Sequence, residues 1–297
     1  MSGLALLLVL SAAVCHAAWN IVAHGVSRIG VPFLWWAALA STVLWAPVIP
    51  FTGGLGTPVS GSDGSNLAVG FAIGVGVSAV LHVLYMLVLQ RGYAVGRLST
   101  VYATARGTGP ALSSFLAVVL LGEQIGLVAA VGIAVIVGGV VATGLIDRAE
   151  PVPGIRRRVD PSIVFGVLTG AAIAAYTIWD AHALRTWGLS PVAFMVGCTA
   201  VELFFWAPQA YRRRNEMLGI LRAHWPRVLA FGVLSPLSYI LVLTAVTMAP
   251  VALVAPLREV SVVLVSLFGV LVLREGYAVR RVTASVVVLA GVLMLAG

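Results

Sequence analysis

Long apolar runs, separated by short polar segments, recur along the whole chain. Each run extends over about 18 residues or more, and at about 1.5 Å per helical residue it can cross a hydrocarbon core about 30 Å thick. The pattern predicts an all-α membrane protein with ten transmembrane helices. The expected spans lie near residues 3–25, 31–51, 66–89, 98–120, 124–146, 161–184, 190–210, 227–247, 249–272 and 278–296.

Composition and charge agree with this interpretation. Charged residues make up 9% of the chain and hydrophobic residues 61%, whereas a soluble domain is about one quarter charged. The formal net charge of +8 comes mainly from arginines in the segments between spans, where basic residues are the usual orientation signal of a membrane protein. We therefore expect contact with a lipid bilayer and no binding of nucleic acid.

The chain divides into two similar halves. Residues 147–160 hold prolines and an arginine run and have the composition of a linker, here expected in the cytoplasm, between residues 1–146 and residues 161–297. Each half has five expected spans, so the second copy must enter the membrane upside down, which predicts two inverted five-helix repeats. The aligned positions are Tyr85 with Tyr239, Arg106 with Arg258, and Trp19-Asn20 with Trp179-Asp180.

Loop charge predicts an orientation. Fifteen arginines lie in the loops that follow the odd-numbered spans, whereas the other face has only Arg185. Because basic loops remain in the cytoplasm, this distribution places the arginine-rich loops inside and both termini outside.

Two short motifs mark the first half. The run from His16 to Asn20 (HAAWN) lies in the first span, and Leu121 to Glu123 (LGE) closes the fourth, ahead of a glycine-rich fifth span. Together with the ten-span layout, they resemble the drug/metabolite transporter superfamily, in particular its EamA-type ten-helix permeases, over nearly the whole chain. The resemblance implies a transporter with cytoplasmic termini, so it leaves the orientation open against the loop charge. The chain departs from the pattern at Arg274, where the second motif would have glycine.

Two arginines are expected inside the spans. Arg106 and Arg258 occupy equivalent repeat positions, and an arginine pairs bidentately with carboxylate or phosphate, so they predict a central site for an anionic or zwitterionic substrate. The alternative is that Glu202, Glu259 or Asp180 neutralises both arginines and the groups only hold helices together. The other candidate substrate-binding residues are Tyr102, Asn20, Trp19, Tyr85, Tyr239 and Ser261.

Further ionisable residues inside the spans are candidates for ion coupling. Such groups are costly in a membrane, and a buried carboxyl can carry a proton, for which Glu202 is the preferred candidate. The remaining coupling candidates are Asp180, Glu259, His16, His24 and His82. Interhelical hydrogen bonds are the alternative role for the histidines. The GxxxG pairs Gly70/Gly74 and Gly166/Gly170 indicate close helix packing.

Several classes of function lack their signatures. The chain contains no lysine and therefore no P-loop lysine, and it has no metal-ligand spacing and no known catalytic motif. Cys15 and Cys198 are expected to be ordinary core cysteines. We expect no catalytic residue, metal or cofactor.

The sequence favours a secondary active transporter in the cytoplasmic membrane. It would move a small polar metabolite by alternating access, driven by an ion gradient or by exchange, with homodimerisation left open. A membrane-embedded enzyme acting on a lipid or polyprenyl phosphate is the alternative, and a non-transporting membrane partner is a third.

Overall fold

The chain folds into helices that follow the predicted spans. The computed structural model describes residues 1–24, 26, 29–57, 64–96, 98–146, 160–272 and 278–296. These residues contain no β-strand, and their only β-type pairing is one isolated bridge. The elements are α1 (Gly3–His24), α2 (Val31–Trp45), η2 (Ala46–Thr52), α3 (Gly64–Val95), α4 (Leu98–Leu121), α5 (Leu127–Ile146), α6 (Pro161–Trp187), α7 (Pro191–Arg212), α8 (Arg214–Met248), α9 (Val251–Leu257), α10 (Val260–Leu271) and α11 (Ala278–Ala296).

The prediction of an all-α protein with many membrane spans is confirmed. Among the described residues, eight segments are long and apolar enough to cross a membrane, and a shorter apolar helix covers Leu127–Thr143. One of the eight, Val251–Leu271, contains both α9 and α10. Each of the ten predicted spans therefore has a helical counterpart, the last being α11.

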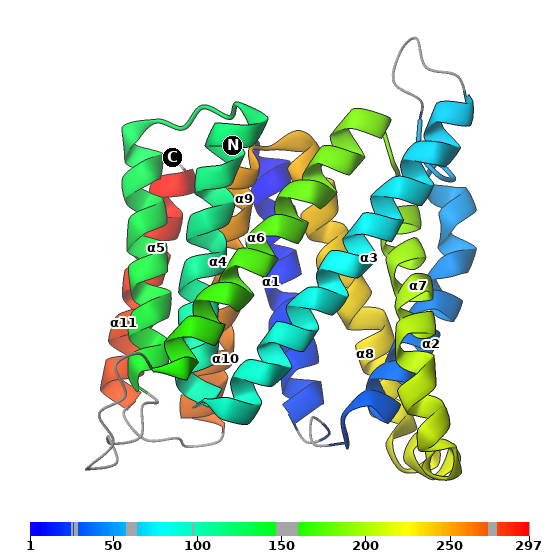
Figure 1. Cartoon of the computed structure of the whole chain (residues 1–297). Coiled ribbons are helices and arrows are strands. Elements are labelled where there is room, and N and C mark those ends of the chain that lie inside the picture. Colours follow the sequence, from blue (N-terminus) through cyan, green and yellow to red (C-terminus); the bar gives the residue numbers. More distant parts are fainter. Residues whose placement is uncertain are drawn as a thin grey trace. The chain divides into compact units, whose positions relative to one another are not determined.

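The described chain forms two compact units. Unit 1 contains Met1–Leu6, Leu84–Ile178 and Met248–Gly297, and unit 2 contains Leu7–Val83 and Trp179–Thr247. Each unit takes segments from both predicted repeats. In unit 1 the chain begins and ends at the same end of the helices, as an even number of crossings requires (Figure 1).

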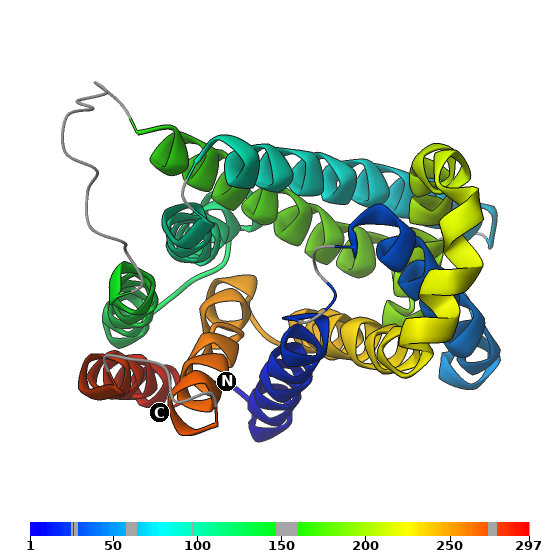
Figure 2. The ribbon, with the colours of Figure 1, turned by 90° about the horizontal axis from the view of Figure 1, so that it is seen from below.

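Packing inside the units joins equivalent spans of the two repeats. In unit 1, α5 packs against α11 and α4 against α9, and in unit 2, α2 packs against α7. These are the fifth and tenth, fourth and ninth, and second and seventh spans. Figure 2, a view from below, shows α5 and α11 side by side. Such pairing is the arrangement expected of two repeats related by a pseudo-twofold axis.

Glycines allow α5 and α11 to approach closely. A Cβ atom on Gly132 would lie 3.0 Å from the carbonyl oxygen of Gly291, and one on Gly291 would lie 2.8 Å from that of Gly132. At Gly139 a Cβ atom would lie 2.6 Å from the side chain of Val288. This seam of small residues is typical of membrane helices, whose association depends on close contact between backbones.

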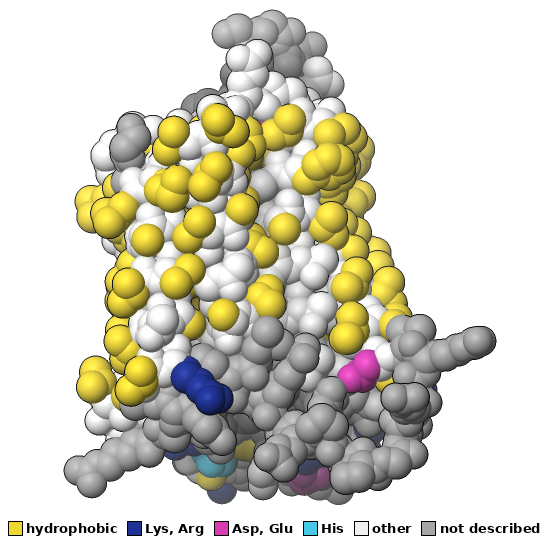
Figure 3. Space-filling model, turned by 90° about the vertical axis from the view of Figure 1, so that its left-hand side faces the viewer, with side chains coloured by type: hydrophobic (Ala, Val, Ile, Leu, Met, Phe, Trp, Pro, Cys, Tyr) yellow, Lys and Arg dark blue, Asp and Glu magenta, His cyan; other side chains and the backbone are white. Residues whose placement is uncertain are grey.

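The outer surface of α5 and α11 is apolar. Figure 3 shows hydrophobic side chains over most of the height of this face, with charged groups confined to one end. The exposed residues include Leu127, Val128, Val131, Val286 and Leu293. A surface of this kind is suited to lipid contact.

The predicted GxxxG contacts are also confirmed. In unit 2, Gly70 faces the ring of Trp187 and Gly74 faces side chains of α6 and α7. In unit 1, Gly166 and Gly170 lie against Thr104 and Thr108 of α4. All four positions serve helix packing.

Prolines explain two departures from the predicted boundaries. The second span changes from an α-helix to a 3₁₀ helix after Trp45, where Pro47 and Pro50 cannot donate α-helical hydrogen bonds. Residues expected in a loop before the eighth span are helical from Arg214, and a kink at His224 (φ −129°) precedes Pro226. The predicted linker, residues 147–160, lies outside the described residues except for Asp160.

Candidate functional site

The ninth span changes its hydrogen-bonding pattern where its charged residues lie. Between α9 and α10, the backbone N–H of Glu259 donates to Pro256 O (3.0 Å) and that of Val262 donates to Glu259 O (2.9 Å). These bonds span three residues rather than four, so the backbone tightens into a 3₁₀-type turn at Arg258 and Glu259. The apolar pattern predicts one continuous helix for this span, although Pro256 already indicates an interruption.

Two side chains from the first repeat satisfy the backbone of α9. Pro256 has no N–H to donate to Ala252 O, four residues earlier, and the hydroxyl of Ser114 donates to that oxygen at 2.8 Å. At the start of the helix, the carboxylate of Glu123 accepts hydrogen bonds from the N–H groups of Val251 (2.8 Å) and Ala252 (2.9 Å). The glutamate of the LGE motif is therefore the N-terminal cap of α9.

Two arginines converge on one buried carboxylate in unit 1. Glu259 is 1% exposed, and Arg106 Nη1 donates to its two carboxylate oxygens at 3.4 and 3.5 Å. Arg258 Nε lies 3.9 Å from Glu259 Oε1. This contact agrees with the alternative expectation that Glu259 neutralises the arginines. The three ionised groups together still carry one positive charge, and the Arg106 contacts are longer than the charge-assisted hydrogen bonds of about 2.7–2.9 Å usual in proteins.

Tyrosines surround Arg106. Its guanidinium carbon lies 5.2 Å from the centroid of the Tyr102 ring, a distance at which a cation is attracted to an aromatic face. The rings of Tyr85 and Tyr176 contact each other edge to face, with centroids 5.7 Å apart, and both lie within electrostatic range of Arg106. Unit 1 therefore brings together Arg106, Arg258, Tyr102 and Tyr85 of the predicted substrate-binding set. Ser261, in the first turn of α10, is buried, and its hydroxyl has no hydrogen-bond partner among the described residues.

A second buried polar cluster lies in unit 2. Asp180 is 1% exposed, and its Oδ2 accepts a hydrogen bond of 2.5 Å from the hydroxyl of Tyr239. The His82 ring contacts the Tyr239 ring edge to face, with centroids 5.7 Å apart. His82 Nδ1 lies 2.9 Å from the carbonyl oxygen of Ser78. Sequence analysis named Asp180, Tyr239 and His82 separately and did not place them together.

The polar residues of the first span make local contacts. The side-chain amide of Asn20 donates to the carbonyl oxygen of His16 in its own helix, at 2.7 Å. Trp19 lies between His16 and Phe231, with ring centroids 4.8 and 5.1 Å away. The side chain of His24 lies outside the described residues. Glu202, on α7, is half-buried.

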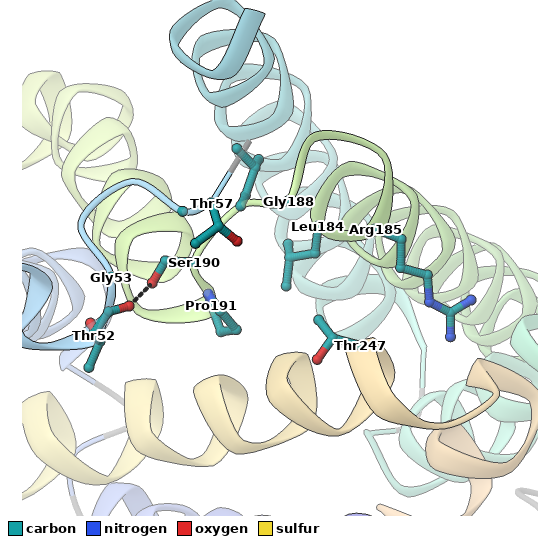
Figure 4. A pocket seen from close by; sticks show the side chains of 11 residues that line it. Thr52, Gly53, Thr57, Leu184, Arg185, Gly188, Ser190, Pro191 and Thr247 are labelled. Carbon is teal, nitrogen blue, oxygen red and sulfur yellow. Dashed lines mark hydrogen bonds between the residues drawn. The ribbon is translucent and has the colours of Figure 1, made fainter. Parts of the chain in front are cut away.

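Unit 2 also has a pocket of about 570 Å³ at its arginine-poor end. Its wall includes Arg185, which is the single arginine expected on this face, together with the hydroxyl residues Thr52, Thr57, Ser190 and Thr247 (Figure 4). Ser190 donates to Thr52 O at 3.1 Å, and Arg185 Nε donates to Val246 O at 2.8 Å. This hydrogen bond holds the guanidinium group of Arg185 beside the hydroxyl groups that line the pocket.

A glycine makes one side of this pocket possible. Gly56 has a φ of 138°, and a Cβ atom there would lie 2.1 Å from the carbonyl oxygen of Gly188. The close approach allows Thr57 N to donate to Gly188 O (3.0 Å) and Ser190 N to donate to Leu55 O (2.9 Å). The loops after the second and sixth spans therefore lie at the same end of unit 2, as the alternation of spans predicts.

Sequence reasoning missed three contributors to these sites. Ser114, Tyr176 and Ser78 lie in membrane-spanning helices, where hydroxyl residues are common, and nothing in their own spacing singled them out. Both cysteines are free, and no group of three or more possible metal ligands occurs within the described residues.

Comparison with known proteins supports a transporter. A search of curated proteins found no relative of this chain. One solved structure, described only as the crystal structure of a protein, has a TM-score of 0.71 and 18% sequence identity, and the match covers 99% of this chain and 96% of the other. That likeness concerns the fold. Residues 160–297 match the EamA-like transporter family, which confirms the predicted resemblance to the drug/metabolite transporter superfamily. The long apolar helices and this match together indicate a multi-pass membrane protein.

Proposed function

We propose that this protein is a secondary active transporter of a small anionic or zwitterionic metabolite in the cytoplasmic membrane, working by alternating access. The observation that carries the proposal is the Arg106–Glu259–Arg258 cluster of unit 1. Two guanidinium groups meet at one buried carboxylate, and a planar guanidinium can also bind a carboxylate or phosphate group of a substrate through two parallel hydrogen bonds.

The position of the cluster supports the same proposal. Secondary transporters often bind their substrates where a spanning helix is interrupted, because irregular backbone at that depth is tolerated where it lines a binding cavity. Arg258 and Glu259 lie at the tightened turn between α9 and α10, and Tyr102 and Tyr85 add aromatic surface near Arg106. The EamA match favours transport over the alternative of a lipid-phosphate enzyme.

Transport by the full chain in proteoliposomes tests this function. The panel would include a neutral amino acid, a dicarboxylate and a sugar phosphate, with choline as the cationic and glucose as the neutral control. We expect at least one zwitterionic or anionic solute to be taken up and exchanged, and choline and glucose to be excluded. If only choline or glucose is taken up, the assignment of an anionic or zwitterionic substrate is overturned.

Lysine variants test the role of the two arginines. Arg106→Lys and Arg258→Lys keep the charge but lose the planar fork. Hydrogen bonds to charged groups contribute about 1.5–3 kcal/mol, so we expect each variant to lose about tenfold or more in transport, with little change in melting temperature. Normal transport by both variants would show that the arginines serve only the helix packing.

A further inference from the structure

The buried acid of unit 2 has an unusual partner. Asp180 is 1% exposed, and the group that hydrogen-bonds its Oδ2 is the neutral phenol of Tyr239, at 2.5 Å. Its Oδ1 is also buried and has no hydrogen-bond partner among the described residues. A phenol can donate a hydrogen bond to a carboxylate but cannot cancel its charge. An ionised carboxylate in such surroundings is costly, and binding a proton at Oδ1 removes that cost.

A histidine lies next to this pair. His82 Nδ1 lies 2.9 Å from the carbonyl oxygen of Ser78 and 3.3 Å from its hydroxyl oxygen. The His82 ring also contacts the Tyr239 ring edge to face, and the hydroxyl of Tyr239 donates to Asp180. A polar imidazole therefore lies beside the partner of the buried acid.

Other titratable and charged groups near Asp180 lie on α7 and on α6 itself. On α7, Cys198 is buried and Glu202 is half-buried. Cys198 lies within electrostatic range of both Asp180 and Glu202. On α6 itself, His182 is exposed and Arg185 donates to Val246 O. Asp180 is the more deeply buried of the two carboxyl groups, so it is favoured over Glu202 as the group whose charge matters most.

The equivalent position of the first repeat supports a specialised role. Trp19-Asn20 aligns with Trp179-Asp180, and Asn20 donates to His16 O in its own helix. Asparagine has nearly the shape of aspartate but cannot bind a proton in this way. The two repeats therefore differ in a single ionisable group at this position, where a purely structural hydrogen bond would be possible with either residue.

We propose that Asp180, with Tyr239 and His82, forms a proton-binding site and that H⁺ is the coupling ion. The coupling role rests on the proposed transport function. A proton from water would add to Asp180 Oδ1 while Tyr239 keeps its own proton, and deprotonation would return it to water. Loading and unloading of this proton would change the charge of the cluster by one unit during the transport cycle.

Infrared spectroscopy of the full chain in lipid membranes tests proton binding, with H⁺ itself as the probe. We expect a protonated-carboxyl band that appears as the pH is lowered, is absent from Asp180→Asn, and is present in Glu202→Gln. Glu216→Gln, which removes an exposed acid, is the matched control and should retain the band. Persistence of the same band in Asp180→Asn, or no band that titrates in the wild type, would overturn the proposal.

Two further variants guard against misfolding. Asp180→Glu keeps a carboxyl group and should keep a titrating band, so a loss in Asp180→Asn alone is not a loss of fold. Tyr239→Phe removes the phenolic donor and should move the band to a different frequency, because the carbonyl stretch depends on hydrogen bonding. An unmoved band would show that the phenol does not contact the titrating group.

A transport measurement separates coupling from function. With an imposed pH gradient, any solute of the panel that the wild type accumulates should not be accumulated by Asp180→Asn, while exchange continues. If the wild type accumulates the solute equally with and without the pH gradient, H⁺ coupling is overturned and the proposed function stands. A titrating Asp180 band with no panel solute transported would support the proton site and count against the proposed function.

Discussion

In unit 1 the buried charge belongs mainly to guanidinium groups, whereas in unit 2 it belongs to a carboxyl group bonded to a phenol. Arginine stays protonated at any accessible pH, so Arg106 and Arg258 keep their charge and can only change the groups that they contact. The cluster around Asp180 can change its charge by taking up a proton. Burial alone therefore does not define the role of a site, because permanent charge suits recognition and removable charge suits coupling.

The largest effect on stability is expected when one of the buried arginines of unit 1 is replaced by an apolar residue. Arg106→Leu removes the guanidinium that donates to Glu259, and Arg258 Nε, at 3.9 Å, is too far away to replace the hydrogen bond. Breaking a buried ion pair by removing one partner costs about 3–5 kcal/mol, and the 3.9 Å contact of Glu259 with Arg258 offsets only part of this loss. We expect a large fall in melting temperature of the purified protein.

The double variant Arg106→Leu/Glu259→Leu sharpens the test. Replacing a buried ion pair by apolar side chains of similar volume is often neutral for stability, but this double variant also takes the Glu259 carboxylate away from the buried Arg258, so it should recover only part of the melting temperature. It should not recover transport if the cluster binds substrate. If both the melting temperature and transport recovered, the cluster would serve only helix packing and would not bind substrate, and its contrast with the proton site of unit 2 would be lost.

An intermediate effect is expected at the cap of α9. Glu123→Ala removes the acceptor of two backbone N–H groups, those of Val251 and Ala252, and at about 1 kcal/mol for each hydrogen bond we expect a loss of about 2 kcal/mol. Thermal unfolding measures it. Glu123→Gln retains one acceptor oxygen and should lose roughly half as much. Equal stability of all three proteins would contradict the capping role.

A smaller effect is expected at the carbonyl group freed by Pro256. Ser114→Ala removes the hydroxyl that donates to Ala252 O and should cost about 1 kcal/mol. In a Pro256→Ala background an N–H group becomes available to the same oxygen, so the serine should matter less there. A double-mutant cycle in melting temperature gives the coupling, and simple additivity of the two changes would argue against this compensation.

The smallest effect is expected for the exposed ion pair at the start of α8. Arg213 donates to Glu216 at 2.6 and 3.2 Å, but both side chains are about half exposed, so water and salt screen the interaction. Glu216→Gln should leave the melting temperature and transport near those of the wild type. A marked loss would mean that surface charge, and not only buried charge, determines the behaviour of this protein.

The sequence predicted the elements of this protein better than their contacts. Apolar runs set the number and order of spans, because the bilayer fixes their length. The contacts Arg106–Glu259 and Tyr239–Asp180 join residues 153 and 59 positions apart, and they depend on how each helix is rotated about its axis. Helices that are apolar on all sides carry little information about that rotation, since lipid and protein interior are similarly apolar.

The site was predictable in part for a related reason. Ionisable side chains stand out against apolar spans, so Arg106, Arg258 and Asp180 were identified one by one. Hydroxyl groups such as that of Ser114 do not stand out, because serine is common in membrane helices. The turn at Arg258 could have been expected from Pro256 two residues earlier, since proline removes a helical hydrogen bond.

The seam between α5 and α11 bears on how the chain is made. Gly132 and Gly139 on α5 lack a side chain and so allow α11 to pack closely against them. Of the described helices, α11 is the last to be synthesised. Before α11 is synthesised, these glycines lack the helix against which they pack in the folded protein. During synthesis of the second repeat, α5 is therefore in the bilayer without this contact. A nascent chain arrested before residue 278 should therefore be unusually exposed to quality-control proteases, whereas completion of the last helix should bring resistance.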